Sequence, residues 1–342
     1  MRILLGLSGG VDSAYAAKKL MQDGHCVEGA VLLMHEHTEI DAAALAAQEL
    51  SIKLHVIDAT DEFNRIVKEN FVSEYLSART PNPCIICNER VKFKFLYDFA
   101  MKEGFDAIAT GHYAKVTKIC DQFGQRYAIS QAEDTKKDQS YMLYRLPQKI
   151  LSTLVLPLGD TTKLDVRKEA KSRSLSAADR RDSQEICFLP DGNYAEYIES
   201  VRGPSKKGDF IDEKGNILGT HNGIIRYTVG QRKGLGISLG SRVFVTEINP
   251  DDNTVTLSGE PKGKSEIFIS DPVFSGVTPK MLSNPIKARV KIRYSAPLVE
   301  AECRLLSDGR ISLKFDAPLR AAPGQSAVAY IDKSVAFGGI IC

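Results

Sequence analysis

The stretch SGGVDS, residues 8–13, follows the apolar run Ile3-Leu4-Leu5-Gly6-Leu7 and opens a small-residue segment that extends from Ser13 to Leu20. This pattern predicts a short strand, a tight turn with paired glycines and a helix. Such a turn directs backbone N–H groups and a helix N-terminus at an anion, so we expect it to bind phosphate. The spacing matches neither GxxxxGK[ST] nor GxGxxG. A plain tight connection between strand and helix is the alternative.

Apolar runs and helical segments alternate along the residues that follow. Apolar runs end at Met34, Asp58 and Thr110, with an alanine-rich segment at 40–50 between the first two. This alternation predicts a parallel, doubly wound α/β sheet. Ligands of such sheets lie at the carboxyl ends of the strands, where we expect Met34 and Gly111 to approach a nucleotide. For Met34, a position in the core is the alternative.

The composition is that of a globular protein of two or three domains. The chain has 342 residues, of which 43% are hydrophobic and 26% charged. Because no stretch is long and apolar enough to span a bilayer and no leader precedes the first strand, we expect a cytoplasmic protein without a membrane partner. Residues 261–342 carry twelve Lys and Arg against seven Asp and Glu, which points weakly to an anionic partner.

The seven cysteines do not indicate a disulfide framework, since their number is odd and the chain is long. Cys84 and Cys87 lie in TPNPCIICN (80–88), whose two prolines predict a constrained loop before a basic, aromatic helix. A zinc site and a redox pair are open alternatives, but no second CxxC or HxxxH pair is present. We favour a catalytic thiol, its thiolate stabilised by the helix start and by Arg90 and Lys92.

Two further patterns point to nucleic acid. In residues 287–293, KARVKIR, a period of two places Lys287, Arg289, Lys291 and Arg293 on one face of a strand, in a row that contains no acidic residue. We favour an RNA contact for this face over a solvated edge strand. The glycine-spaced basic loop around residues 228–236 either contacts nucleic acid or is a structural loop.

Six segments of the chain occur in one order, from the end of the first strand into the central part of the chain. They are Ser8–Ser13, Asn82–Asn88, Ala109–Tyr113, Lys137–Ser140, Asp182–Phe188 and Thr228–Gly236. Together they resemble the bacterial tRNA-specific 2-thiouridylase family of PP-loop ATP pyrophosphatases. The resemblance implies an α/β PP-loop catalytic domain (1–196), a small central mainly-β domain (197–260) and a C-terminal β-barrel that contacts tRNA (261–342).

The resemblance also implies an activity, the ATP-dependent 2-thiolation of the wobble uridine of tRNA. The C2 oxygen of the base is adenylated, and a cysteine persulfide then delivers sulfur. The implied cofactors are ATP and Mg²⁺, with no metal bound tightly by the protein. The implied partners are tRNA and a sulfur donor protein such as a cysteine desulfurase or a sulfur relay protein. Another adenylating PP-loop ligase and a catalytically silent tRNA-binding relative are the alternatives.

The same resemblance assigns roles to individual residues. Cys187 would carry the persulfide, and Cys87, the nucleophile, would release the sulfur by forming a disulfide with it. The apolar neighbours of Cys187 make simple burial the alternative. Cys84 stands where many relatives carry Asp, so its role is open. The remaining implied contacts are Gly6, Leu7, Ser8, Gly9, Gly10, Val11, Asp12, Ser13, Met34 and Gly111 for ATP, Asn82, Pro83 and Cys84 for the target base, and Lys137, Asp138, Gln139, Arg293 and Tyr294 for tRNA.

Overall fold

The N-terminal part of the chain is built on a parallel sheet. The computed structural model describes residues 1–342 except 173–175, 180–185, 190, 238–239 and 241. Five strands in the order β3-β2-β1-β4-β7 form this sheet, all parallel to one another. They are β1 (Arg2–Gly6), β2 (Cys26–Leu33), β3 (Leu54–Asp58), β4 (Ala107–Thr110) and β7 (Leu154–Val155). The predicted parallel α/β sheet is confirmed.

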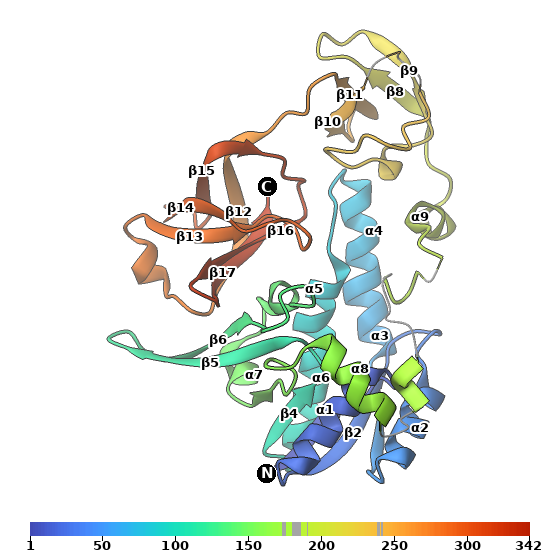
Figure 1. The fold of residues 1–342 in the computed structure, drawn as a ribbon. Helices are drawn as coiled ribbons and strands as arrows, with labels where there is room; N and C mark the ends of the chain where they lie inside the picture. The colour runs from blue at the N-terminus through green and yellow to red at the C-terminus, as the bar shows by residue number, and fades with distance from the viewer. Residues whose placement is uncertain (173–175, 180–185, 190, 238–239, 241) are drawn as a thin grey trace.

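Helices cover both faces of the sheet (Figure 1). Ile3 and Leu5 pack with α1, α2 and α8 on one face, whereas Leu4 packs with α6 and α7 on the other. This follows from the alternation of side chains along a strand. The helices of this part are α1 (Val11–Gln22), α2 (Ile40–Glu49), α3 (Thr60–Glu62), η1 (Phe63–Lys68), α4 (Glu69–Leu76), α5 (Pro83–Cys87), η2 (Asn88–Lys92), α6 (Phe93–Lys102), η3 (Ser140–Leu143), α7 (Gln148–Leu151), α8 (Lys163–Ser172), η4 (Ser176–Asp179) and α9 (Tyr194–Arg202).

The C-terminal part is a closed barrel of six strands. Their order is β12-β15-β14-β13-β16-β17, and pairing of β12 with β17 closes the ring. The elements are β12 (Lys264–Phe274), η6 (Pro279–Leu282), β13 (Ile286–Lys291), β14 (Val299–Leu305), β15 (Ile311–Leu319), β16 (Ser326–Ile331) and β17 (Ser334–Ile341). The predicted β-barrel is therefore confirmed. In Figure 1 it lies beside α4 and α5, on the left of the view.

A hairpin from the N-terminal part extends the sheet of the barrel. It consists of β5 (Ala114–Asp121) and β6 (Gly124–Gln131), and Ser130 of β6 pairs with Ser334 of β17. The hydroxyl groups of these two serines lie 2.7 Å apart. The attachment of this hairpin to a strand about two hundred residues later was not expected from the sequence.

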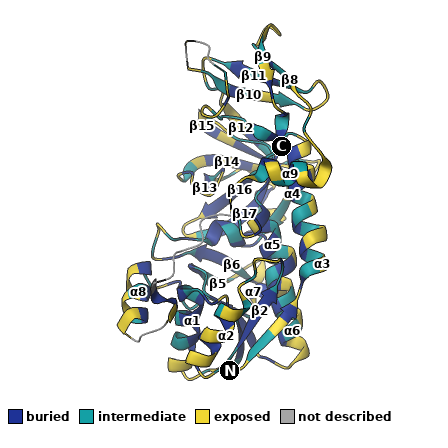
Figure 2. Cartoon of the chain, turned by 90° about the vertical axis from the view of Figure 1, so that its right-hand side faces the viewer, coloured by how far each residue is buried: buried dark blue, intermediate teal, exposed yellow. Residues whose placement is uncertain are grey.

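The central part is a small four-stranded sheet with the order β10-β11-β8-β9, drawn at the top of Figure 1. Its core contains Phe210, Val245 and Val255. The elements are β8 (Gly208–Ile211), β9 (Ile217–His221), η5 (Ile224–Arg226), β10 (Phe244–Asn249) and β11 (Thr254–Ser258). Figure 2 shows that buried residues follow the strands throughout the molecule, while exposed residues lie on the outer faces of the helices. None of the described helices has the length and apolar character needed to cross a bilayer.

The loop expected around Cys84 and Cys87 is a helix, so that prediction was wrong. Pro83 occupies the first turn of α5, where its missing N–H would have no partner in any case. The chain then continues through η2, a π-helical turn, into α6. The two prolines thus mark the start of a helix, and they place Cys84 in its first turn and Cys87 at its end.

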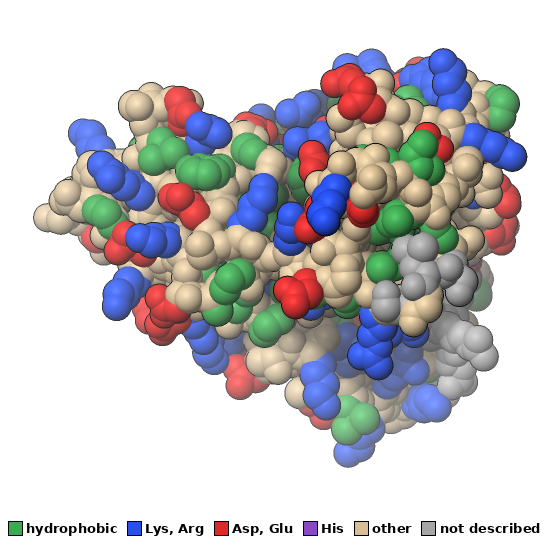
Figure 3. Space-filling view, turned by 90° about the horizontal axis from the view of Figure 1, so that it is seen from above, with side chains coloured by type: hydrophobic (Ala, Val, Ile, Leu, Met, Phe, Trp, Pro, Cys, Tyr) green, Lys and Arg blue, Asp and Glu red, His purple; other side chains and the backbone are tan. Residues whose placement is uncertain are grey.

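The predicted basic face of β13 is only partly correct. Lys287, Arg289 and Arg293 are exposed and Lys291 is half-buried, whereas Ala288, Val290 and Ile292 are buried, so the alternation is confirmed. However, Lys287 pairs with Glu302 and Arg289 with Glu300 on β14. Because directly paired residues of neighbouring strands share a face, this face does contain acids, which one strand's sequence does not show. Figure 3 likewise shows basic and acidic side chains interspersed over the barrel, on its left.

Candidate nucleotide and thiol site

The turn after β1, residues 8–13, has a geometry suited to binding an anion, and we call it the cradle. Gly9 adopts a φ of 75°, which favours glycine, and Gly10 precedes the first turn of α1 without a side-chain cap on that helix. The first N–H groups of a helix have no acceptor within it, so those of α1 can point at a ligand. The hydroxyl of Ser13 donates to the carbonyl of Gly10 at 2.9 Å and lies 3.3 Å from that of Ser8.

Two glycines allow close packing around this cradle. A Cβ on Gly9 would lie 2.5 Å from the carbonyl carbon of Ala42 in α2. A Cβ on Gly111 would lie 2.8 Å from the backbone of Asp12 and Ser13. The end of β4 therefore rests directly on the start of α1, and Gly111 lies beside the turn.

Asp12 has partners that the sequence did not suggest. Its carboxylate accepts hydrogen bonds from Lys163 Nζ at 2.7 and 2.8 Å and from the hydroxyl of Tyr113 at 2.7 Å. Lys163, at the start of α8, is 151 residues away along the chain. No local pattern in the sequence indicates such a pair. A lysine or arginine near the end of a parallel strand was a signal that could have suggested a partner for Asp12. The ion pair fastens α8 to the cradle.

Met34 links the cradle side of the sheet to the cysteines. It follows β2, is half-buried, and its sulfur lies 3.9 Å from Cys87 Sγ. Cys87 itself is 6% exposed, whereas Cys84 is exposed. Asn88, the next residue, donates from its amide to the carbonyl of Met142 at 3.0 Å, which holds the end of α5.

Cys187 is brought to the same place by its apolar neighbours. Phe188 packs against Phe63 and Phe71 with ring centroids 5.6 and 5.5 Å apart, in the hydrophobic cluster that also contains Cys87. Cys187 itself is exposed, so burial as a small hydrophobic residue is wrong for it. All seven cysteines are free thiols. Asp182 and Ser183 of the preceding motif lie outside the described residues.

Surrounding protein atoms exclude water from the three thiols and raise the pKa of each, although Cys84 and Cys187 as whole residues keep exposed surface. For Cys87 the pKa rises to about 12, and Cys84 and Cys187 are raised for the same reason. Lys92 opposes the rise in each case, whereas Cys84 and Cys187 raise the pKa of Cys87, and Cys84 raises that of Cys187. The expectation that a helix start stabilises the Cys87 thiolate was therefore wrong, because Cys87 lies at the C-terminal end of α5.

Of the residues expected to face the target base, Asn82 lines a hollow between the N-terminal part and the barrel. Asn82 borders a cavity of about 510 Å³ between α4, α5 and the barrel, which Asn70 and Ser326 also line. Pro83 is buried, and the exposed Cys84 follows it. The barrel fixes the approach to this hollow, because Thr80 donates from its N–H to the carbonyl of Pro323 at 2.7 Å.

The residues expected to contact tRNA from two distant segments are neighbours in space. The hydroxyl of Tyr294 donates to the carbonyl of Asp138 at 3.2 Å. The carboxylate of Asp138 is buried and accepts from Ala132 and Ser140, and Gln139 accepts from the N–H of Tyr113. Asp138 and Gln139 therefore shape this corner through internal contacts, while Arg293 is exposed at its rim.

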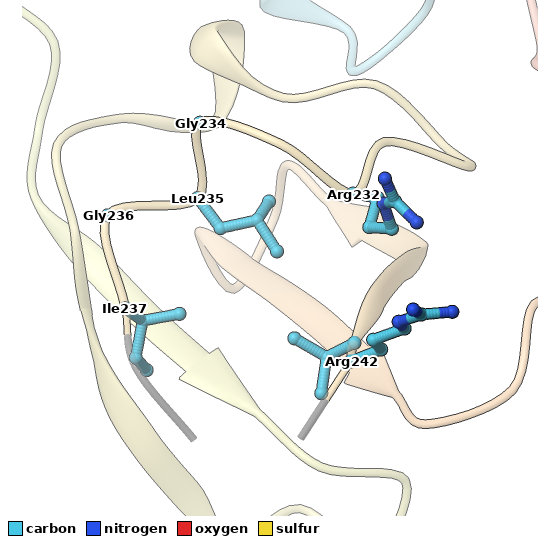
Figure 4. Close-up of a pocket in the computed structure, with 7 residues that line it drawn as sticks. Arg232, Gly234, Leu235, Gly236, Ile237 and Arg242 are labelled. Atoms are coloured by element: carbon cyan, nitrogen blue, oxygen red, sulfur yellow. The ribbon is translucent and has the colours of Figure 1, made fainter. Parts of the chain in front are cut away.

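A second cavity, of about 520 Å³, lies in the central part (Figure 4). Arg232 and Arg242 border it on one side, and Gly236 and Ile237 on the other. The glycine-spaced loop thus forms a wall of a pocket, and whether it contacts nucleic acid stays a prediction.

Comparison with known proteins identifies the family. Models described as tRNA methyl transferase HUP domain, tRNA methyl transferase PRC-barrel domain and aminomethyltransferase beta-barrel domain match residues 1–191, 195–259 and 264–341. The tRNA-specific 2-thiouridylase MnmA of Acetivibrio thermocellus is 42% identical over 99% of both chains. The chain belongs to the tRNA-specific 2-thiouridylase family.

Other 2-thiouridylases agree with this assignment. The tRNA-specific 2-thiouridylase MnmA of Clostridium perfringens is 40% identical over 99% of this chain and 98% of its own. The resemblance found from six sequence segments is confirmed. Among solved structures, a 4-thiouridine synthetase in complex with RNA and ATP is 16% identical, covers 58% of this chain and 50% of its own, and has a TM-score of 0.35, too low to carry an argument.

Proposed function

We propose that this chain is a tRNA-uridine 2-sulfurtransferase, which uses ATP to replace the C2 oxygen of the wobble uridine by sulfur. One observation supports this proposal above the others. Phe188, the neighbour of Cys187, packs in the hydrophobic cluster that contains Cys87, so two cysteine-bearing segments a hundred residues apart lie together, and Met34 lies beside Cys87.

The cradle fits the phosphates of ATP. Glycine at positions 9 and 111 leaves room for close backbone approach, and the first turn of α1 supplies N–H groups and the positive end of a helix dipole. The residues we assign to ATP are Gly6, Leu7, Ser8, Gly9, Gly10, Val11, Asp12, Ser13, Met34 and Gly111. Asp12 is neutralised by Lys163, so we propose that Mg²⁺ enters with the triphosphate.

The thiols carry the sulfur chemistry in a balanced sequence. Adenylation of the C2 oxygen releases pyrophosphate and turns that oxygen into part of a leaving group. The Cys87 thiolate then attacks Sγ of the Cys187 persulfide, which forms a Cys87–Cys187 disulfide and releases hydrosulfide. Hydrosulfide adds to C2, and AMP leaves with the oxygen. A dithiol reductant must reopen the disulfide before the next turnover.

Substrate and partners follow from the same assignment. The flipped base would meet Asn82, Pro83 and Cys84. The tRNA would contact Lys137, Arg293 and Tyr294 at the corner that Asp138 and Gln139 shape through their internal hydrogen bonds. A cysteine desulfurase or a sulfur relay protein would load Cys187, which is exposed. We propose a cytoplasmic site of action and the domain division 1–196, 197–260 and 261–342.

The decisive experiment measures the modified base. Unmodified tRNA is incubated with the protein, ATP, Mg²⁺ and a sulfur source, and the wobble uridine is analysed by mass spectrometry. Cys87→Ser and Cys187→Ser should each abolish thiolation and leave tRNA affinity near that of the wild type. Cys120→Ser, which removes an exposed thiol on the β5–β6 hairpin, is the matched control and should retain activity.

The same assay separates the proposal from its alternatives. Pyrophosphate release that depends on a small amine acceptor rather than on tRNA would indicate an amidating ligase. Binding of tRNA without any pyrophosphate release would indicate a silent relative. Full thiolation by either cysteine variant would contradict the two-thiol chemistry.

A further inference from the structure

Tyr113 joins the cradle to the segment that we assign to tRNA. It lies just after β4 and is 2% exposed. Its N–H donates to the side-chain oxygen of Gln139 at 2.9 Å, and its carbonyl accepts from the N–H of Gln139 at 2.8 Å. Its hydroxyl donates to the carboxylate of Asp12 at 2.7 Å. One buried residue thus contacts both proposed sites.

The segment that Tyr113 contacts is itself held firmly. We call residues 134–139 the contact loop, and Tyr113 pairs with its last residue. The carboxylate of Asp138 in this loop accepts from the hydroxyl of Ser140 at 2.8 Å. From the barrel, the hydroxyl of Tyr294 donates to the carbonyl of Asp138 at 3.2 Å. The contact loop and the barrel corner beside it are therefore fixed relative to Tyr113.

A second link runs from the other end of the contact loop to the same carboxylate. The side chain of Asp134 accepts from the N–H of Lys163, the first residue of α8, at 3.0 Å and from that of Lys136 at 3.1 Å. The ammonium group of Lys163 donates to both carboxylate oxygens of Asp12, at 2.8 and 2.7 Å. Both ends of the contact loop are therefore connected to Asp12 in the cradle.

The hydroxyl of Tyr113 is not needed to neutralise Asp12. Lys163 forms an ion pair with that carboxylate at 2.7 Å and is 8% exposed. Loss of the hydroxyl would leave this ion pair in place, and the ring of a phenylalanine would fill the same space. The bond from Tyr113 therefore contributes to the position of the cradle rather than to its charge balance.

We propose that Tyr113 is a positioning residue for adenylation, which fixes the distance between the cradle and the contact loop. This inference rests on the proposed function. In the adenylation step the C2 oxygen of the base attacks the α-phosphorus of ATP and forms an oxygen–phosphorus bond. The bond from that phosphorus to pyrophosphate breaks, and the N3 proton of the base passes to water.

The two reactants of this step are held by different segments of the chain. ATP is assigned to the cradle, and tRNA is assigned to the corner formed by the contact loop and the barrel. An error of about 1 Å in the relative position of two reactants costs on the order of 100-fold in rate. Direct hydrogen bonds from one buried residue to both segments limit that error.

The test compares the wild type, Tyr113→Phe and Tyr144→Phe in tRNA-dependent pyrophosphate release with unmodified tRNA, ATP and Mg²⁺. The kcat and the KM for ATP are measured, together with the Kd for tRNA without ATP and the unfolding free energy in urea. Tyr144→Phe is the matched control, because it also removes a buried tyrosine hydroxyl, one that lies 3.1 Å from the hydroxyl of Ser326 in the barrel.

Tyr113→Phe should lower kcat by about 10-fold, because one of the two links is lost and the resulting displacement is a fraction of 1 Å. The KM for ATP and the Kd for tRNA should stay within about twofold of the wild type, since each segment keeps its own contacts with its reactant. The control should keep kcat within about twofold, because it alters neither link. A lower kcat with both affinities retained indicates relative placement, which a general loss of packing would not give.

A Tyr113→Phe variant with the wild-type kcat would overturn the proposal. So would a loss explained entirely by a higher KM for ATP, since the hydroxyl would then act on the nucleotide alone. An equal fall of kcat in the control, or a fall that matches the unfolded fraction of the variant, would overturn it as well. The wild-type reaction tests the proposed function separately: pyrophosphate release without thiolation would refute sulfur transfer and leave this inference standing, whereas release independent of tRNA would refute both.

Discussion

Replacing Gly111 by Ala tests whether the end of β4 sets the position of the phosphate cradle. The added Cβ would lie 2.8 Å from the carbonyl carbon of Asp12 and 2.8 Å from the nitrogen of Ser13. Ordinary contact begins at 3.4 Å, so the backbone of the cradle must shift by about 0.6 Å. Neither partner is a flexible side chain that could move aside.

The magnitude follows from this shift. Overpacking of a well-packed site costs about 1–3 kcal/mol of unfolding free energy. A displacement of about 1 Å in a positioning element costs on the order of 100-fold in rate, so we expect pyrophosphate release to fall by about 10- to 100-fold. Affinity for tRNA should not change, because the altered contact lies on the nucleotide side of α1.

The assay compares tRNA-dependent pyrophosphate release, tRNA binding and denaturant unfolding in the same preparations. Gly259→Ala is the matched control, since among the described residues its Cβ would meet nothing closer than the carbonyl of Arg242 at 4.0 Å. A Gly111→Ala variant that releases pyrophosphate at the wild-type rate would refute the contact between β4 and the cradle as the determinant of nucleotide position.

Two further predictions concern the thiols. Phe188→Ala removes the ring that packs on Phe63 and Phe71. Thiolation should therefore fall severalfold while pyrophosphate release persists. Equal loss of both activities would mean that the ring supports the whole domain. Burial raises the pKa of Cys303 from 9.0 to about 12, so the folded barrel keeps a proton that the unfolded chain loses, and stability should fall as pH rises above 9. Between pH 9 and 11 the unfolding free energy of Cys303→Ala should decline less steeply than that of the wild type. The two slopes should differ by about 1.4 kcal/mol per pH unit, as measured by urea unfolding.

Local sequence patterns correctly predicted those parts of the fold that depend only on neighbouring residues. The turn at Gly9 and Gly10 and the alternation of strand and helix could be read directly, because glycine freedom and hydrophobic periodicity act over a few residues. The helix at Pro83 was missed for a local reason too, since a proline that ends one helix is equally suited to begin another.

Long-range contacts account for what the sequence did not show. Lys163 reaches Asp12 across 151 residues, and Glu300 and Glu302 come to the basic face of β13 only through the pairing of strands. The ionisation of Cys87 depends on its burial beneath the segment of Phe188. Each of these features requires the folded chain, because spacing within one segment carries no information about it.

The pairing of Ser130 in β6 with Ser334 in β17 also has a consequence for the order in which the strands are synthesised. The two serines are 204 residues apart, so at a synthesis rate of 5–20 residues per second the ribosome makes β17 about 10–40 s after β6. During that interval β6 presents an unpaired sheet edge, which is a template for wrong association. The nascent N-terminal domain therefore exposes that edge until the barrel strand arrives to occupy it.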